Sequence, residues 1–318
     1  MTIKSDVLKI LEQNRNISIS GQELAKQLNV SRMSICKVIK KLKEEGYNIE
    51  ASTNKGYMLL DNNDILSSEG ISCYLDKKMD IYAYKTIDST NTQMKKFAVD
   101  NHVDYALIVA EHQSAGRGRF NRVFYSPEKQ GIYMSLLLRY NQTFNDATLI
   151  TIQSAVAIKR VIKKLCGIDT KIKWVNDLYY QGKKICGILT EAISDFESRM
   201  IEAIIIGIGI NVSTKQFPEE LLDKATSLGI ENINRSKFIA LIVNEILKII
   251  DEDFDNVLNE YKDASCVLNK KVEFRYKGQI YNGIAKDINN LGNLIVKCDN
   301  QEYTLNSGEV SIIQKNYE

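Results

Sequence analysis

The chain has 318 residues, long enough for two or three domains with a substantial core, and its hydrophobic content of 44% is ordinary for a soluble protein. Its formal net charge of +2 hides an uneven distribution, because lysines cluster near the N-terminus. The six cysteines are scattered and there are only two histidines, so a local zinc motif is excluded. We expect no signal peptide, because the first residues lead into an amphipathic segment, and no apolar run is long enough to span a membrane. We therefore expect a cytoplasmic protein with reduced thiols and no membrane partner.

Residues 4–60 show the pattern of a winged helix-turn-helix. Apolar residues at helical spacing predict three short helices, and Ser20 and Ser31 are placed to cap the second and third. Two short apolar segments flank a turn at Thr53–Gly56, which predicts a wing hairpin. The third helix has a basic face, typical of a helix that enters the DNA major groove, although a helical interaction domain with a solvated lysine face is the alternative. The candidate DNA-binding residues are Ser31, Arg32, Lys37, Lys40 and Lys41.

The central region alternates strands and helices. Asp61–Asp64 is a polar linker, Asp88–Asn91 opens a helix, and the apolar run Tyr105–Ala110 predicts a buried strand. The next elements are a strand over 131–139, a helix with its apolar face between 152 and 165, a hairpin that turns at 181–182, and a buried strand over 203–211. That last strand contains Gly-x-Gly, but the third glycine and the helix of a dinucleotide-binding fold are missing, so we reject that fold.

Near the C-terminus the spacing of the apolar residues changes from helical to alternating. Apolar residues at helical spacing predict late helices between about 238 and 261. From about residue 268 the period becomes two, with turns at Lys277–Gly278, Asn290–Gly292 and Asp299–Asn300. This pattern predicts a small β-barrel.

Four short motifs carry the chemistry. Glu111–Arg119 contains Gly-Arg-Gly-Arg, whose glycines allow close backbone approach and whose guanidiniums bind carboxylate or phosphate; alone, such a repeat is more often a solvated loop. The others are Asp88–Asn91, Lys173–Asp177 and Lys184–Leu189. In this order and spacing the four motifs resemble those of the biotin protein ligases. The resemblance runs from end to end, as in the bifunctional ligases that also repress transcription.

The resemblance implies the fold, the domains and the reaction. The fold is α+β, with a winged helix-turn-helix over 1–63, a mixed α/β catalytic domain like that of class II synthetases over 64–267, and an SH3-like β-barrel over 268–318. In the first step the biotin carboxylate attacks the α-phosphate of ATP, with Mg²⁺ on the phosphates, and in the second a lysine of a biotin carrier domain attacks biotinyl-adenylate. Cations near both anions assist the first step, and a carboxylate assists the second by holding or deprotonating the amine.

The residue assignments follow the matched motifs. Catalysis is assigned to Lys184, Arg119 and Asp177. Biotin would contact Ser89, Thr90, Asn91, Gln113, Gly116, Arg117, Arg119 and Lys184. ATP or the adenylate would contact Arg119, Lys173, Trp174, Asn176, Lys184, Gly207, Gly209 and Asn211. No metal site built from protein ligands is expected. Alone, Trp174 would more often be a core residue than a platform for adenine, and only the flanking Lys173 and Asn176–Asp177 make a site position equally well supported. Lys183, one position before the matched lysine, is better explained as a solvated neighbour of Lys184.

Three positions depart from the family pattern. Val175 stands where proline is usual, and Asn121 and Phe124 replace the usual glycine and tryptophan, which makes the path of the loop an open question. Two other functions compete with the proposed one: a lipoate-activating enzyme of the same fold, and a repressor that senses biotin without ligating it.

Partners also follow from the resemblance. We expect a biotin carrier domain, operator DNA and a second copy of the chain, with biotinyl-adenylate ordering the loop at 116–122 and promoting the homodimer.

Overall fold

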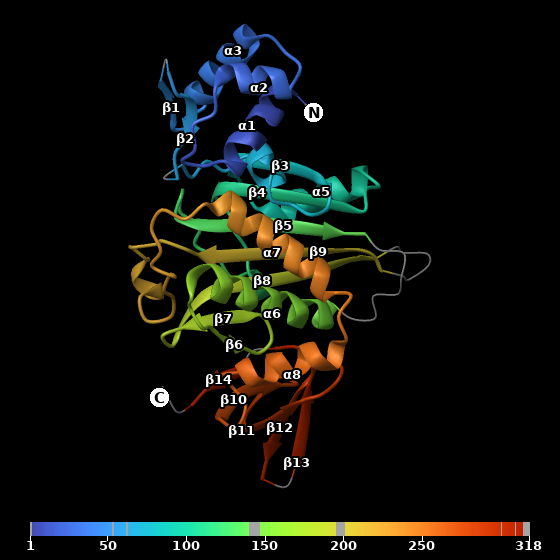
Figure 1. Cartoon of the computed structure of the whole chain (residues 1–318). Helices are drawn as coiled ribbons and strands as arrows, with labels where there is room; N and C mark the ends of the chain where they lie inside the picture. The colour runs from blue at the N-terminus through green and yellow to red at the C-terminus, as the bar shows by residue number, and fades with distance from the viewer. Residues whose placement is uncertain are drawn as a thin grey trace. The chain divides into compact units, whose positions relative to one another are not determined.

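The computed structural model describes residues 2–52, 54–61, 63–139, 147–194, 201–299, 301–308 and 310–313 (Figure 1). The chain forms two compact units. One comprises Met1–Ala83 and Glu231–Leu241, and the other comprises Tyr84–Ile230 and Ile242–Glu318. The C-terminal strands therefore belong to the same unit as the central sheet, and the predicted three-domain boundaries stay a prediction.

The N-terminal unit contains the predicted helix-turn-helix. Its elements are α1 (Ile3–Gln13), α2 (Gly21–Gln27), α3 (Arg32–Glu44), β1 (Ile49–Ser52) and β2 (Gly56–Leu59). Ser20 caps α2 by accepting from the backbone N–H of Glu23, and Ser31 caps α3 by accepting from that of Ser34, as predicted. β1 and β2 pair in antiparallel register, with Ser52 opposite Gly56, so the wing hairpin is confirmed, although Thr53 lies outside the described residues.

The predicted linker, Asp61–Asp64, ends in a residue that forms partly buried polar contacts. Asp64 accepts hydrogen bonds from Nε and the backbone N–H of Arg235, at 2.6 and 3.0 Å, and this arginine is only 1% exposed. Beyond it, helix α4 (Ser68–Ser72) and Tyr74 follow, and the Tyr74 hydroxyl donates to the Glu12 carboxylate at 2.8 Å. Residues 67–74 therefore pack with the helix-turn-helix, where the buried Glu12 gains a hydrogen-bond partner.

The second unit is built on a seven-stranded sheet. Its strands follow the order β3-β4-β5-β9-β8-β7-β6, and the pairings from β4 to β6 are antiparallel. The strands are β3 (Asp80–Ile87), β4 (Tyr105–Gln113), β5 (Gly131–Leu138), β6 (Lys171–Lys173), β7 (Asp177–Tyr180), β8 (Lys183–Ser194) and β9 (Ile201–Asn211). The hairpin predicted at 181–182 joins β7 to β8, and Gln181 and Gly182 both have positive φ, as a tight two-residue turn requires.

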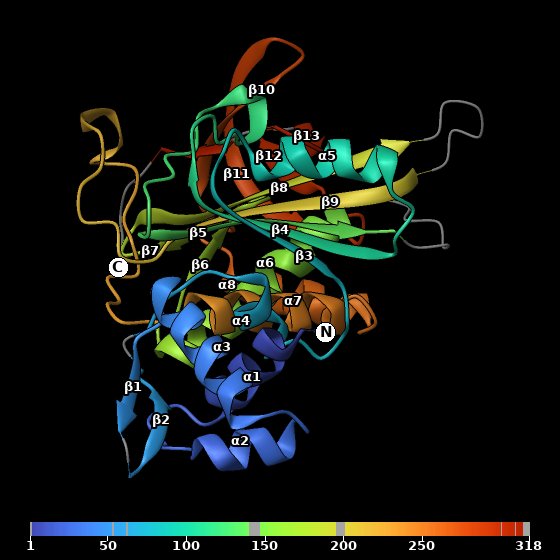
Figure 2. The ribbon, with the colours of Figure 1, turned by 90° about the horizontal axis from the view of Figure 1, so that it is seen from above.

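Helices cover both faces of this sheet. Figure 2 shows α5 (Thr90–Asp100) on one face and α6 (Ala147–Cys166) on the other, with α8 (Phe254–Ala264) on the α6 side. Met94 and Ala98 of α5 pack on Ile108, Leu137 and Ile205 of the sheet. Helix α7 (Arg235–Ile249) begins in the N-terminal unit and ends in this one. No helix among the described residues is sufficiently long and apolar to span a membrane.

The C-terminal region forms a second sheet of short strands, in agreement with the change of period, whereas the predicted barrel stays a prediction, because the two edge strands are not paired with each other among the described residues. Its strands are β10 (Lys271–Tyr276), β11 (Gln279–Ile288), β12 (Leu294–Cys298), β13 (Gln301–Leu305) and β14 (Val310–Ile312). They form an antiparallel sheet in the order β13-β12-β11-β10-β14. The sheet curls, because Tyr303 of β13 packs edge-on against Phe274 of β10, three strands away, with ring centroids 5.4 Å apart. The α+β class is thus confirmed.

Candidate functional site

A cavity of about 550 Å³ lies in the second unit, over the face of the sheet that α5 covers. Its lining combines the four motifs that lie far apart in the sequence. The predicted site residues in the lining are Ser89, Thr90, Asn91, Gln113, Arg117, Arg119, Lys173, Asn176, Asp177, Lys184, Gly207, Gly209 and Asn211. Gly116 and Trp174 are not in the lining.

Glycines form the floor of the cavity. Gly187 of β8 pairs with Gly209 of β9, and two residues further Leu189 pairs with Gly207. A Cβ atom on Gly209 would lie 2.5 Å from the Phe124 ring, and one on Gly207 would lie 2.1 Å from Oδ1 of Asn91. Only glycine allows these side chains to reach the sheet backbone, which explains the Gly-x-Gly that sequence analysis could not assign to a nucleotide fold.

The Gly-Arg loop folds back on itself above this floor. The backbone N–H of Gly118 donates to the carbonyl of Arg122, and that of Phe124 donates to the carbonyl of Gly116. Gly116 is needed because a Cβ atom there would lie 2.7 Å from the Phe124 carbonyl oxygen. Asn121 has a φ of 56°, in the left-handed region that asparagine tolerates better than most residues, so it can stand where glycine is usual. Asparagine at this position therefore permits the same left-handed backbone that glycine would.

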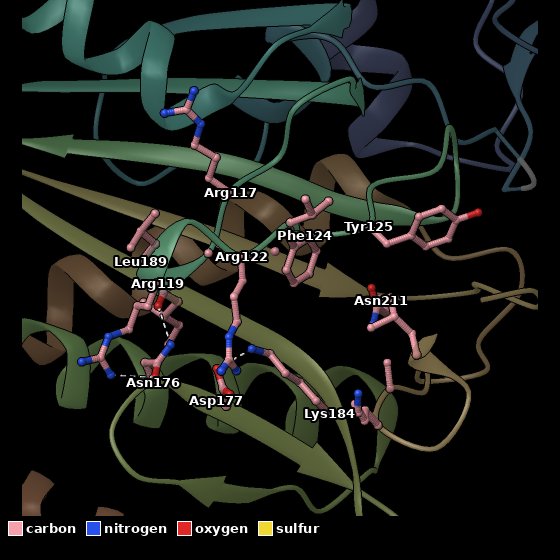
Figure 3. Close-up of a pocket in the computed structure, with 18 of the residues that line it drawn as sticks. Arg117, Arg119, Arg122, Phe124, Tyr125, Asn176, Asp177, Lys184, Leu189 and Asn211 are labelled. Atoms are coloured by element: carbon pink, nitrogen blue, oxygen red, sulfur yellow. Dashed lines mark hydrogen bonds and ion pairs between the residues drawn. The ribbon is translucent and has the colours of Figure 1, made fainter. Parts of the chain in front are cut away.

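Three cationic side chains lie around Asn176 and Asp177. The Lys184 Nζ atom lies 2.6 Å from Oδ1 of Asp177, and Nη1 of Arg119 donates to Oδ1 of Asn176 at 3.2 Å. Figure 3 shows Arg122 reaching toward Asp177 and Lys184, whereas Arg117 points away from them. The sequence analysis missed Arg122, although it lies only three residues after Arg119 in the same basic loop. This arrangement can hold two anions side by side.

The other end of the cavity, here called the neutral end, is lined by the neutral polar side chains of Ser89, Thr90 and Gln113. Ser89 caps α5, and the backbone N–H of Thr90 donates to Oε1 of Gln113 at 2.9 Å. The Gln113 amide also donates to Oγ of Ser126 at 3.0 Å. Asn91 donates to the carbonyl of Leu189 and to Glu191, so both of its amide hydrogens are already used. Asn91 therefore supports the wall, and its placement does not favour the predicted direct contact with biotin.

Trp174 occupies a structural position. It is 3% exposed, and its indole N–H donates to the carbonyl of Gly292 in the C-terminal sheet region at 2.9 Å. The carbonyl of the next residue, Val175, accepts from the buried Tyr261 hydroxyl of α8 at 3.1 Å. The pair thus ties β6, α8 and the C-terminal strands together. The placement favours the core alternative for Trp174 over a contact with the nucleotide.

The segment Phe217–Ala225 forms a wall that sequence analysis did not find. The backbone N–H of Lys184 donates to the carbonyl of Lys224, and Nζ of Lys183 donates to the carbonyl of Leu222 at 2.6 Å. Lys183 is therefore not simply a solvated neighbour, because it holds this wall beside β8. The segment brings Asp223 and Lys224 to the cavity, and its sequence carries no periodic signal that would have placed it there.

Thiols near the cavity are neutral. Burial raises the pKa of Cys186, which lies within β8, and burial raises the pKa of Cys266 in the cavity lining to about 11. All six cysteines are free, as predicted. Within the described ranges no group of three His, Cys, Asp or Glu side chains is arranged to hold a metal ion.

A second candidate site lies on α3 of the N-terminal unit. Ser31, Arg32, Lys37, Lys40 and Lys41 are all exposed, while Ile35, Ile39 and Leu42 face the core of that unit. The ion pair between Lys40 and Glu44 is 3.9 Å long and highly exposed, so it hardly restrains the lysine. The basic side chains of this face are therefore exposed where phosphate groups could approach, whereas the Ser31 hydroxyl is used in capping α3.

The comparisons with known proteins agree with this geometry. Residues 83–211 match the Biotin/lipoate A/B protein ligase family, residues 4–58 match an HTH domain, and residues 267–312 match the Biotin protein ligase C terminal domain. The bifunctional ligase/repressor BirA of Bacillus subtilis (strain 168) is 38% identical over 232 residues, 71% of each chain. BirA of Escherichia coli (strain K12) is 28% identical over 301 residues, 92% of each chain. Biotin protein ligase from Aquifex aeolicus in complex with biotin and ATP superposes with a TM-score of 0.63 at 26% identity, over 73% of this chain and 97% of that one.

Proposed function

Because the chain belongs to the family of the bifunctional ligase/repressor BirA, we propose that it is an ATP-dependent biotin protein ligase that also represses transcription. The observation that carries this proposal is the cavity, which has cations at one end and neutral hydrogen-bonding groups at the other. Biotin has matching ends, namely a carboxylate and a ureido ring. The enzyme forms biotinyl-adenylate and transfers biotin to a lysine of a biotin carrier domain.

The charged end suits the first step. A carboxylate and a phosphate repel each other, and Lys184, Arg119 and Arg122 lower the free energy of bringing them together. The lining offers only two carboxylates, Asp177 and Asp223, and the first is paired with Lys184. The magnesium ion that ATP carries would therefore be held mainly by phosphate oxygens and water, where it neutralises phosphate charge.

The second step uses the same ion pair in another way. When Lys184 turns toward substrate anions, the Asp177 carboxylate loses its partner at 2.6 Å. It can then accept a hydrogen bond from the incoming lysine of the carrier domain, which must be neutral to attack. Lys184 thus serves adenylation, and Asp177 serves transfer.

The neutral end favours biotin over lipoate. A dithiolane ring offers no hydrogen-bonding N–H or C=O to Ser89, Thr90 and Gln113, so these polar groups would be desolvated without compensation. An ATP–pyrophosphate exchange assay with each acid tests this choice. Exchange with biotin alone supports the proposal, and exchange with lipoate alone supports the competing enzyme.

Ligation itself has a direct test. Incubation with ATP, Mg²⁺, biotin and a biotin carrier domain is expected to increase the mass of the carrier by one biotinyl group. Biotin binding without any mass increase would instead support a repressor that only senses biotin. Because ATP, carrier domain and operator DNA meet in the cytoplasm, we place the protein there.

A further inference from the structure

A buried polar network lies behind the neutral end of the cavity. Ser135 stands in the otherwise apolar strand β5 and is fully buried, opposite Gly207 of β9. Its hydroxyl donates to Oδ1 of Asn91, and Oγ lies 2.8 Å from Oγ1 of Thr90. Asn91 donates in turn to Oε2 of Glu191 at 2.9 Å. No motif of the sequence pointed to Ser135 or Glu191, and neither belongs to the reaction described above.

Two acceptors, the Glu191 carboxylate and the Leu189 carbonyl, together fix the direction of the bonds in this network. An ionised carboxylate only accepts, so the Asn91 amide must turn its NH₂ group toward Glu191 and its oxygen toward Ser135. The single hydroxyl hydrogen of Ser135 is then committed to Asn91. Gly207 makes this arrangement possible, since a Cβ atom there would overlap the Asn91 amide.

The same constraint reaches Thr90. Because Ser135 donates to Asn91, its contact with Oγ1 of Thr90 offers Thr90 only an acceptor, and Oε1 of Gln113, 3.2 Å from the same hydroxyl, is also an acceptor. The one hydrogen of the Thr90 hydroxyl is therefore used inside the protein. Because Thr90 lines the cavity, its hydroxyl oxygen can only accept a hydrogen bond from a ligand, which suits an N–H group.

We infer that Glu191 and Ser135 are positioning residues that select a ureido N–H by fixing Thr90 as a hydrogen-bond acceptor. This inference rests on the proposed binding of biotin. The ion pair between Glu191 and Lys95, at 2.6 Å, uses the other carboxylate oxygen and is half exposed on the lysine side. The orientation therefore depends on the hydrogen bond to Asn91 and not on Lys95.

Calorimetric titration of the full chain tests this network. Glu191→Ala and Ser135→Ala are each expected to weaken biotin binding about 10- to 100-fold, since a buried donor or acceptor is left unpaired. ATP affinity should be unchanged, and Glu191→Gln, which retains an accepting oxygen, should restore part of the loss. The double variant should bind little worse than either single variant, because both act through Asn91.

Two controls separate positioning from general effects of charge. Lys95→Ala removes the ion pair alone, and Glu202→Ala removes a glutamate of the neighbouring strand β9 that pairs with Arg139 at 3.9 Å. Both should bind biotin as the wild type does. A biotin analogue with its ureido nitrogens methylated should be rejected by the wild type and discriminated less by Glu191→Ala and Ser135→Ala.

The outcomes are distinguishable. If the wild type itself does not bind biotin, the proposed function fails. If the wild type binds biotin and Glu191→Ala and Ser135→Ala bind it equally well, or lose ATP affinity to the same degree, the positioning role is refuted while the proposed function stands.

Discussion

Lys184 and Asp177 show how one residue pair can serve two reactions. Their contact at 2.6 Å joins β7 and β8, and the missing side chain of Gly187 leaves space for the lysine, because a Cβ atom there would lie 3.1 Å from Nζ. In the proposed mechanism, the pair separates when the substrate anions bind. At this scale the chemistry depends on a few side chains whose positions are set by glycines.

Substitution of either member should separate the two steps. Lys184→Ala is expected to lower the rate of adenylate formation about 10²- to 10³-fold, because one cation facing two anions is lost. Asp177→Asn should slow transfer to the carrier domain more than adenylation. Single-turnover kinetics with preformed adenylate measures transfer alone, and a Lys184→Ala enzyme with normal adenylation would contradict the assignment.

At the level of elements, one arginine joins three helices. Arg160 of α6 forms ion pairs with Glu245 of α7, Glu252 after α7 and Glu260 of α8, at 3.0, 3.0 and 2.8 Å. The helices that support the sheet opposite the cavity are thus linked by charge as well as by apolar packing. The hydrogen bond from Arg160 to the Glu252 carboxylate holds the pKa of Glu252 below its ordinary value of 4.5.

This depressed pKa predicts a pH dependence of stability. A carboxylate whose folded pKa is lowered stabilises the fold fully above its ordinary pKa of 4.5 and loses that contribution as the pH falls through the folded value. Glu252→Gln should therefore lower the free energy of unfolding at pH 7, and the difference from the wild type should shrink below pH 4.5. Urea unfolding at several pH values measures it. A difference that is constant with pH would show that the ion pairs are not its cause.

At the scale of the whole molecule, enzyme and DNA-binding module share one chain. Within the N-terminal unit, the Tyr74 hydroxyl donates to Glu12 of the helix-turn-helix, and residues 64–74 are joined to 234–236 by polar contacts, among them Asp64 with Arg235. The biotin cavity lies entirely in the other unit. Any coupling between biotin ligation and DNA binding therefore requires both units of the chain.

The basic face of α3 predicts a salt-dependent affinity for DNA. Replacing Lys40 or Lys41 with glutamine should weaken binding to the same degree on all sequences and reduce the slope of log affinity against log salt by about 1, because each releases one phosphate contact. Arg32, at the start of α3, should instead contribute to sequence preference. Fluorescence anisotropy with specific and random duplexes separates these effects. An unchanged slope would exclude the phosphate role.

Ligand is expected to control assembly. We predict that biotinyl-adenylate, bound beneath the loop at 116–122, promotes homodimerisation and tighter operator binding, with a coupling of about 1–3 kcal/mol. The backbone bonds that close this loop already hold it compact, so the ligand would add contacts to the arginines. Sedimentation with a non-hydrolysable adenylate analogue measures the effect. A dimer of equal strength without the analogue would refute this control and leave the ligase activity unaffected.

The sequence by itself determined those features that depend on neighbours along the chain. Helix caps at Ser20, Ser31 and Ser89, the hairpin turn at Gln181–Gly182 and the change to period two after residue 268 are local patterns, and the structure has each of them. The four motifs also pointed to one cavity, because each belongs to a strand end or helix start that the sheet brings together. The exposed edge strand β3 and the short β6 went unpredicted, since neither has a clear alternation of buried residues.

Only the tertiary structure decided which side chains meet. Trp174 donates to the carbonyl of Gly292, 118 residues away. The amide of Asn91, on α5, is hydrogen-bonded to Leu189 and Glu191 of β8 and to Ser135 of β5. Lys183 gains its role from the carbonyl of Leu222, in a segment with no periodic pattern. Such hydrogen bonds join residues far apart in sequence, and whether a polar group has a partner is settled by the packing of several elements at once. The choice between binding a ligand and supporting the wall therefore becomes visible only after the chain has folded.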